Sequence, residues 1–222
     1  MMKNNLTTIY IIRHGESEYN ATTDENIAFV KKFGIKGAPL TEKGKKQIQK
    51  RAIHLKNIHF DAIFSSGVIR TEQSAELMKL KRKIAIQTMK ILRERLSYLI
   101  PGKTFKETEN EIRKGLKNLD NKAKLAYKPD NQRETSNESS NETAARLLTF
   151  LREIAIAYRN KTILIINHGN NMRALLQHLG YATYDELLPA DTIENAAFIV
   201  LESDGVDFFI KETKGIHKIH AN

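Results

Sequence analysis

Two histidines, His14 and His168, each stand directly before a glycine and at the end of a run of apolar residues. An imidazole that is neutral near pH 7 can act as a nucleophile, a base or a metal ligand. Arg13 precedes His14 and carries a fixed, permanently charged fork that suits a phosphate or a carboxylate. A single histidine after a strand is more often structural than catalytic. Because the pattern occurs twice, we expect one site that holds both imidazoles.

The residues before these histidines predict how the two side chains are positioned. Residues 9–12 and 162–166 form short continuous runs, which are typical of strands buried on both faces of a parallel sheet. The carboxyl ends of such strands meet at one edge of the sheet, where open α/β sheets bind their ligands. If the two strands are neighbours, His14 and His168 meet at that edge.

Strands and helices are predicted to alternate along the chain. We therefore expect a single domain over residues 1–222 with an α/β fold of three α/β/α layers, in which helices cover both faces of a mostly parallel central sheet. Thr41 is the expected N-cap of one helix, and Ser65 or Ser66 the expected cap of the next. A flap over the site is expected at 21–39, and a polar loop at 128–143. The other expected strands are 60–64, 84–89, 197–201 and 206–210, and the expected helices contain residues 27–33, 48–55, 70–74, 105–119, 147–158 and 172–179.

Arg70 and Glu94 extend the chemistry that the site offers. Arg70 falls in the first two turns of the helix after the second strand, and a helix N-terminus with an arginine binds phosphate well; otherwise Arg70 is a surface residue. Arginines that hold phosphate oxygens, an imidazole that attacks phosphorus and a carboxylic acid that protonates the leaving oxygen together suit phosphoryl transfer. The arginines and the second histidine supply the positive charge, so we expect no metal and no cofactor.

Composition limits the class of protein. The chain has 222 residues, of which 41% are hydrophobic, and no cysteine, so disulfides and cysteine-based zinc sites are excluded. We find no signal peptide and no run near the roughly 20 apolar residues of a membrane span, and we expect a cytoplasmic protein without a membrane partner. The net charge of +10 fits a lysine-rich surface or attraction of a phosphorylated substrate, whereas 7% aromatic residues make nucleic acid an unlikely partner. The sequence does not indicate an oligomeric state.

Several segments in order resemble the histidine phosphatase superfamily, which includes the cofactor-dependent phosphoglycerate mutases. The resemblance covers residues 8–201 and implies a phosphoglycerate mutase-like fold that acts on a small phosphorylated substrate. The similar segments are Arg13-His14-Gly15-Glu16 with Asn20, Leu40-Thr41 with Gly44 and Gln47, Phe64-Ser65-Ser66 through Arg70-Thr71 and Gln73, Leu92-Arg93-Glu94, Glu138-Ser139 with Arg146, and Asn167-His168-Gly169-Asn170-Asn171-Met172-Arg173.

The resemblance implies a role for each matching residue. His14 would be the nucleophile and pass through a phosphohistidine. Arg13, Arg70 and His168 would hold the phosphoryl group and stabilise its transition state. Glu94 would be the proton donor and afterwards the base for water.

The resemblance also implies contacts around the phosphoryl group. Asn20 and Gly169 would contact the phosphate, and Asn170 would contact the substrate or cap its own helix. Glu16 is the rival proton donor, since it is closer to His14 in the sequence, although its expected role is to orient nearby side chains.

Departures from the family pattern leave four readings. The chain lacks the Phe-x-Gly-Trp element of the mutases and contains no Trp, so we favour a phosphatase that hydrolyses phosphate monoesters over a mutase. Glu94 is followed by residues 95–98 without the glycine of many family phosphatases, and Glu94-Arg95 resembles the mutases. A third reading is a catalytically weak binding protein on the same fold. A metal site of His14, Glu16 and His168 is disfavoured, because Arg13 would repel a cation.

Overall fold

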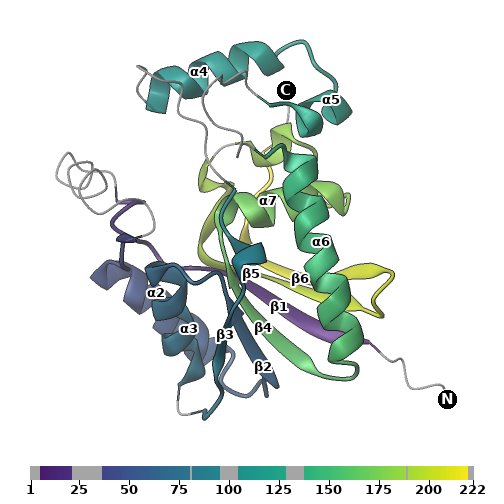
Figure 1. The fold of residues 1–222 in the computed structure, drawn as a ribbon. Coiled ribbons are helices and arrows are strands. Elements are labelled where there is room, and N and C mark those ends of the chain that lie inside the picture. The colour runs from purple at the N-terminus through teal and green to yellow at the C-terminus, as the bar shows by residue number, and fades with distance from the viewer. Residues whose placement is uncertain are drawn as a thin grey trace.

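The computed structural model describes residues 6–21, 37–80, 82–95, 105–128, 138–188 and 190–219. Within these ranges six strands form one sheet in the order β3-β2-β4-β1-β5-β6 (Figure 1). The strands are β1 (Thr7–Arg13), β2 (Ala62–Ser65), β3 (Ile86–Thr88), β4 (Thr162–Asn167), β5 (Ile193–Ser203) and β6 (Phe208–Ile216).

The prediction that the strands before His14 and His168 are neighbours is confirmed. The prediction of a mostly parallel sheet is corrected, because the sheet is mixed. β1 pairs with β4 in parallel, as β2 does with β4 and with β3. β5 runs antiparallel to both β1 and β6. After α7 (Gly169–His178), the turns η3 (Asp185–Leu187) and η4 (Ala190–Thr192) return the chain to the edge where β4 ends. β5 therefore starts at that edge and runs in the opposite direction.

Helices cover both faces of the sheet, which confirms the three-layer α/β/α fold. Figure 1 shows α2 (Glu42–His54) and α3 (Ile69–Lys79) on one face, and α6 (Ser140–Ala157) with α7 on the other. Successive side chains of β1 point to opposite faces of the sheet, so the strand contributes to the core on both sides. Ile9 and Ile11 belong to the core cluster that contains residues of α6 and α7, and Ile12 belongs to the cluster that contains residues of α2 and α3. A strand covered on both faces must be apolar on both, as the run at 9–12 predicts.

The helix ends confirm some predicted boundaries and correct others. Thr41 caps α2, with its side chain accepting from the Gly44 amide. The predicted cap at Ser65 or Ser66 is wrong, because α3 starts after Val68 without a side-chain cap. The predicted loop at 128–143 ends earlier, because Ser139 and Glu142 form a capping box at the start of α6; residues 129–137, and 22–36 of the predicted flap, lie outside the described residues.

α4 (Phe105–Leu116) and α5 (Asn121–Ala126) are the other α-helices among the described residues, and a 3₁₀ helix, η2 (Lys90–Leu92), precedes Glu94. Leu119 follows α4 rather than belonging to it. In Figure 1 both α4 and α5 lie at the top of the view, outside the sheet and near the first turn of α6. In the described part of the chain, no helix combines the length and apolar character that a membrane crossing requires.

Candidate active site

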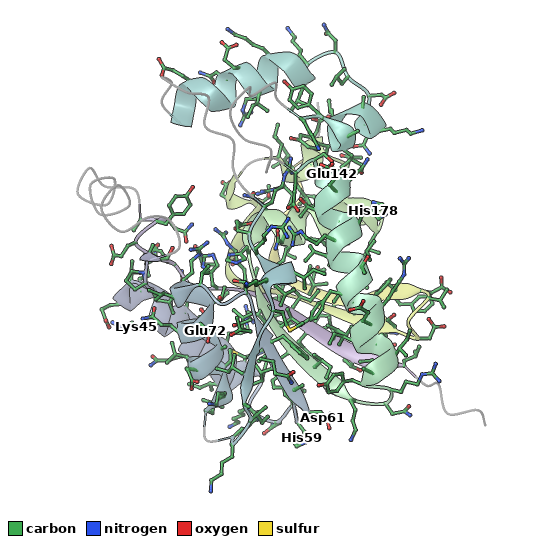
Figure 2. The ribbon with its side chains drawn as sticks, viewed as in Figure 1. Lys45, His59, Asp61, Glu72, Glu142 and His178 are labelled. Carbon is green, nitrogen blue, oxygen red and sulfur yellow. The ribbon has the colours of Figure 1, made fainter. Side chains whose placement is uncertain are left out.

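The register of β1 and β4 brings the two histidines together. Arg13 is paired with Asn167, so the residue after each lies at the same edge, and the His14 amide donates to the Asn167 carbonyl at 3.0 Å. The two imidazole rings lie 5.2 Å apart between centroids, at an angle of 70°. In Figure 2, the label of Asp61, which precedes β2, marks the end of the sheet where the parallel strands begin. The site lies at the other end of these strands, and the label of Glu72 on α3 is nearer to it.

The hydrogen bonds of His14 determine which ring nitrogen is free to react. Nδ1 lies 2.7 Å from the Gly15 carbonyl oxygen, which can only accept, so Nδ1 carries the proton. Nε2 accepts a hydrogen bond from Arg70 Nε at 3.2 Å. Burial, with Arg70 and Arg13 nearby, lowers the pKa of His14 well below 6.5. The ring is therefore neutral near pH 7, and its Nε2 lone pair points into a cationic site.

A chain of hydroxyl groups fixes the proton of His168. Thr71 Oγ1 donates to the Val68 carbonyl at 2.8 Å, so Ser66 must donate its own proton to Thr71, 3.0 Å away. The Ser66 oxygen then accepts from His168 Nε2 at 2.8 Å. Nδ1 is left unprotonated, 3.4 Å from a terminal nitrogen of Arg70. Burial, then His14 and the arginines, lower the pKa of His168 well below 6.5.

Glu94 supplies a carboxyl group whose pKa lies near neutral pH, so that it can be protonated or ionised there. One oxygen lies 3.5 Å from His168 Nδ1, and the other is buried and accepts no hydrogen bond from any described residue. Burial raises the pKa of Glu94 to about 7, although Arg70, Arg13 and Arg173 act to lower it. A carboxyl with such a pKa can donate a proton in one step and accept one in the next.

Arg13 lies in the site with part of its guanidinium unused. It donates to the Ile193 carbonyl of β5, while its Nε is buried and bonds no described residue. A Cβ atom at Gly169 would stand 3.1 Å from this Nε, so the glycine allows the guanidinium to lie against the start of α7. Gly169 thus shapes the site through Arg13.

The remaining sequence-predicted residues bond elsewhere. Glu16 accepts from Thr41 Oγ1 at 2.9 Å and from Lys43 Nζ at 2.7 Å, so its carboxylate lies at the start of α2. The Asn20 side-chain oxygen accepts from the amide and the hydroxyl of Ser17. The Asn170 side-chain oxygen accepts from Arg173 at 2.5 Å.

Four further residues of the site were not predicted as such from the sequence, although all lie within the segments that resemble the family: Arg173, Thr71, Asn171 and Ser66, which was expected only as a helix cap. Arg173 lies one turn after Asn170 on α7, and its pKa falls to about 10 because of burial and then of Arg13. Arg173 also donates to the Leu187 carbonyl. The spacing of three residues from Asn170 is a local signal that could have pointed to this pair.

The donor set suits an anion better than a cation. Ligand atoms of His14, Glu94 and His168 lie within 4.8 Å of one another, close enough to be considered as a metal site. However, Arg70 donates to His14 Nε2, and Arg13 and Arg70 both act on each histidine as positive charges. A phosphoryl group would be attracted by the same charges that repel a metal ion.

The family model of the histidine phosphatase superfamily (branch 1) matches residues 9–214. The chain belongs to this superfamily. It is 28% identical over 191 residues to the broad-specificity phosphatase YOR283W of Saccharomyces cerevisiae, a match that covers 82% of this chain and 74% of that protein.

Proteins named as mutases are also among those similar to this chain. A 2,3-bisphosphoglycerate-dependent phosphoglycerate mutase of Rhizobium etli is 26% identical, with 84% of this chain and 87% of that protein covered. The solved structure of YhfR from Bacillus stearothermophilus superposes with a TM-score of 0.69 at 26% identity, over 95% of this chain and 97% of that one. The resemblance and the phosphoglycerate mutase-like fold expected from the sequence are confirmed.

Proposed function

We propose that the chain hydrolyses phosphate monoesters through a phosphohistidine on His14, without a metal. The observation that carries this proposal is the hydrogen bonding of the His14 ring: Nδ1–H donates to Gly15, and the Nε2 lone pair faces Arg70. A neutral imidazole with its lone pair aimed into a cationic pocket is a nucleophile for phosphorus. When the substrate enters, Arg70 transfers its hydrogen bonds to the phosphoryl oxygens.

In the first step His14 Nε2 attacks phosphorus, and an N–P bond forms as the ester P–O bond breaks. Arg13 and Arg70 hold the non-bridging oxygens and oppose their charge. A substrate that enters as the monoanion brings a proton that His168 Nδ1 can take up, so His168 then donates to a phosphoryl oxygen. The Ser66 hydroxyl keeps Nε2 of the same ring protonated throughout.

Glu94 acts as acid in this step and as base in the next. The protonated carboxyl gives its proton to the leaving alkoxide oxygen. The resulting carboxylate takes a proton from water, whose oxygen attacks phosphorus and breaks the N–P bond. A pKa of about 7 supports both roles, since the carboxyl then changes ionisation state near the working pH. The Glu16 carboxylate, bonded to Thr41 and Lys43, is poorly placed for this chemistry.

Two experiments test the proposal. Purified protein incubated with a radiolabelled phosphate monoester and quenched at alkaline pH should yield an acid-labile phosphoenzyme, and His14→Ala should abolish it with a loss of several orders of magnitude in turnover. Label on another residue would refute the assignment of His14. Phosphate release without any bisphosphate would support a phosphatase, whereas transfer that requires a bisphosphate primer would support the mutase.

The substrate is proposed to be a small phosphorylated molecule, and a phosphate-release screen over sugar phosphates, nucleotides, phosphoamino acids and an aryl phosphate would identify its class. Relatives named as a broad-specificity phosphatase and as a phosphoserine phosphatase support this choice. The absence of cysteine fits a reducing compartment, and the cytoplasm stays our prediction for the location.

A further inference from the structure

Asn171 is a fully buried amide in α7 that bonds the segment carrying Glu94. Its Nδ2 lies 3.1 Å from the Leu92 carbonyl oxygen and 2.8 Å from that of Arg93. Its Oδ1 accepts from the Arg95 amide at 2.9 Å. The side chain thus bonds the backbone on both sides of Glu94.

These bonds hold the two peptide groups that flank Glu94. The Arg93 carbonyl belongs to the peptide before Glu94, and the Arg95 amide to the peptide after it. With both groups bonded to one rigid amide, the backbone angles of Glu94 are restricted, and so is the direction of its Cα–Cβ bond. The position of the carboxyl in the site therefore depends on Asn171, although Asn171 gives its polar atoms to the protein itself.

The same amide connects Glu94 to His168. Asn171 Nδ2 also lies 2.8 Å from Asn167 Oδ1, which accepts from the His168 amide at 2.9 Å. Asn167 is buried as well. The pair of asparagines therefore joins the backbone at His168 to the backbone at Glu94, whose side chains lie 3.5 Å apart.

We propose that Asn171 is a positioning residue for proton transfer, holding the Glu94 carboxyl at its place beside His168 through the backbone of residues 92–95. The inference rests on the proposed function, in which Glu94 is the acid. A displacement of about 1 Å in a reacting group can cost on the order of a hundredfold in rate. Loss of Asn171 should therefore resemble loss of the acid rather than a general loss of stability.

The leaving group reveals this effect. An alkyl phosphate releases a strongly basic alkoxide and needs the proton, whereas p-nitrophenyl phosphate releases a weak base and hardly needs it. We expect Asn171→Ala to lower the ratio of kcat/KM for ethyl phosphate to kcat/KM for p-nitrophenyl phosphate by about tenfold or more. Glu94→Gln provides the reference for complete loss of the acid.

A matched control separates positioning from folding. Gln177 also lies buried on α7, but its amide bonds Ser140 and Tyr184. Gln177→Ala should lose stability without changing the ratio by more than about twofold. A ratio that falls equally in both variants would overturn the proposal. If Asn171→Ala does not fold, Asn171→Ser, which keeps one small polar group, takes its place.

A measurement without substrate distinguishes this inference from the proposed function. The pKa of Glu94, followed by carboxyl ¹³C chemical shifts, should fall from about 7 toward the ordinary 4.5 in Asn171→Ala, because the freed carboxyl reaches water. In Gln177→Ala it should stay near the wild-type value. An unchanged pKa in Asn171→Ala would refute the role of Asn171, whereas absent phosphate release by the wild type would refute only the proposed function.

Discussion

Replacing Glu94 by Gln should make the folded protein more stable at alkaline pH. The amide keeps the size of the side chain, and its NH₂ group can donate to the unprotonated Nδ1 of His168, where Glu94 Oε2 lies 3.5 Å away. Glutamine carries no charge at any pH, while the Glu94 carboxyl must ionise in a largely buried place. The stabilisation therefore measures the cost of keeping this carboxylate in the site.

The pKa of Glu94 sets the size and the pH range of the effect. Its folded value of about 7 lies above the ordinary value of 4.5. The protonated carboxyl thus contributes its full stability below pH 4.5, and this contribution is lost as the pH rises through 7. The difference between these two pKa values corresponds to about 3 kcal/mol of unfolding free energy, most of which is lost between pH 5 and pH 8.5.

Urea denaturation followed by circular dichroism tests this, since the chain has no Trp for fluorescence. The free energy of unfolding of Glu94→Gln minus that of the wild type should grow by about 2 to 3 kcal/mol between pH 5 and pH 8.5, in a buffer free of phosphate. Glu76→Gln, at an exposed position of α3, controls for removing one negative charge from a chain of net charge +10. A difference that is constant or shrinks with pH would refute the environment described for Glu94.

Further perturbations test other parts of the site and the fold. Arg70→Lys should lower kcat/KM by about tenfold or more, because a point charge cannot replace a two-pronged donor; kinetics like the wild type would exclude Arg70 from the phosphate. Thr71→Val should move the ring proton of His168 and Thr71→Ser should not, as read from ¹⁵N shifts; identical spectra would contradict the hydroxyl chain. For the wild type, kcat/KM with ethyl phosphate should fall above about pH 7, where the acid loses its proton, relative to kcat/KM with p-nitrophenyl phosphate; parallel profiles would contradict Glu94 as acid. Leu80→Gly should raise the unfolding free energy by about 1 kcal/mol, because Leu80 is partly exposed at φ 52° and ψ −118°; a loss would show that its side-chain contacts outweigh this strain.

The central part of the fold could be predicted because its signals are local. A strand covered on both faces must be apolar on both, so residues 9–12 and 162–166 are recognisable within a short window. The cap at Thr41 depends on the three residues that follow it. The order of the family motifs then indicated His14, His168, Arg70 and Glu94, which lie together in the site. The same motifs indicated Asn20 and Asn170, whose side chains bond Ser17 and Arg173 instead.

Other features depend on partners far away in the chain. Serine is a common residue at helix N-caps, but the hydroxyl of Ser66 bonds His168, which lies 102 residues later. Glu16 is near His14 in sequence, yet the start of α2 takes its carboxylate. The role of Asn171 depends on the backbone of residues 92–95, and no periodic pattern predicts such a contact.

The place of β1 in the sheet has a consequence for how the protein is made. This strand lies between β4 and β5, both of which follow it by most of the chain length. During synthesis the apolar run of β1 therefore leaves the ribosome long before either neighbouring strand exists, and the entropy of closing so long a loop slows the later pairing. Until then β1 is an unpaired apolar segment of the kind that chaperones bind. A nascent chain that ends before Asn167 contains His14 but lacks His168, so its active site is incomplete.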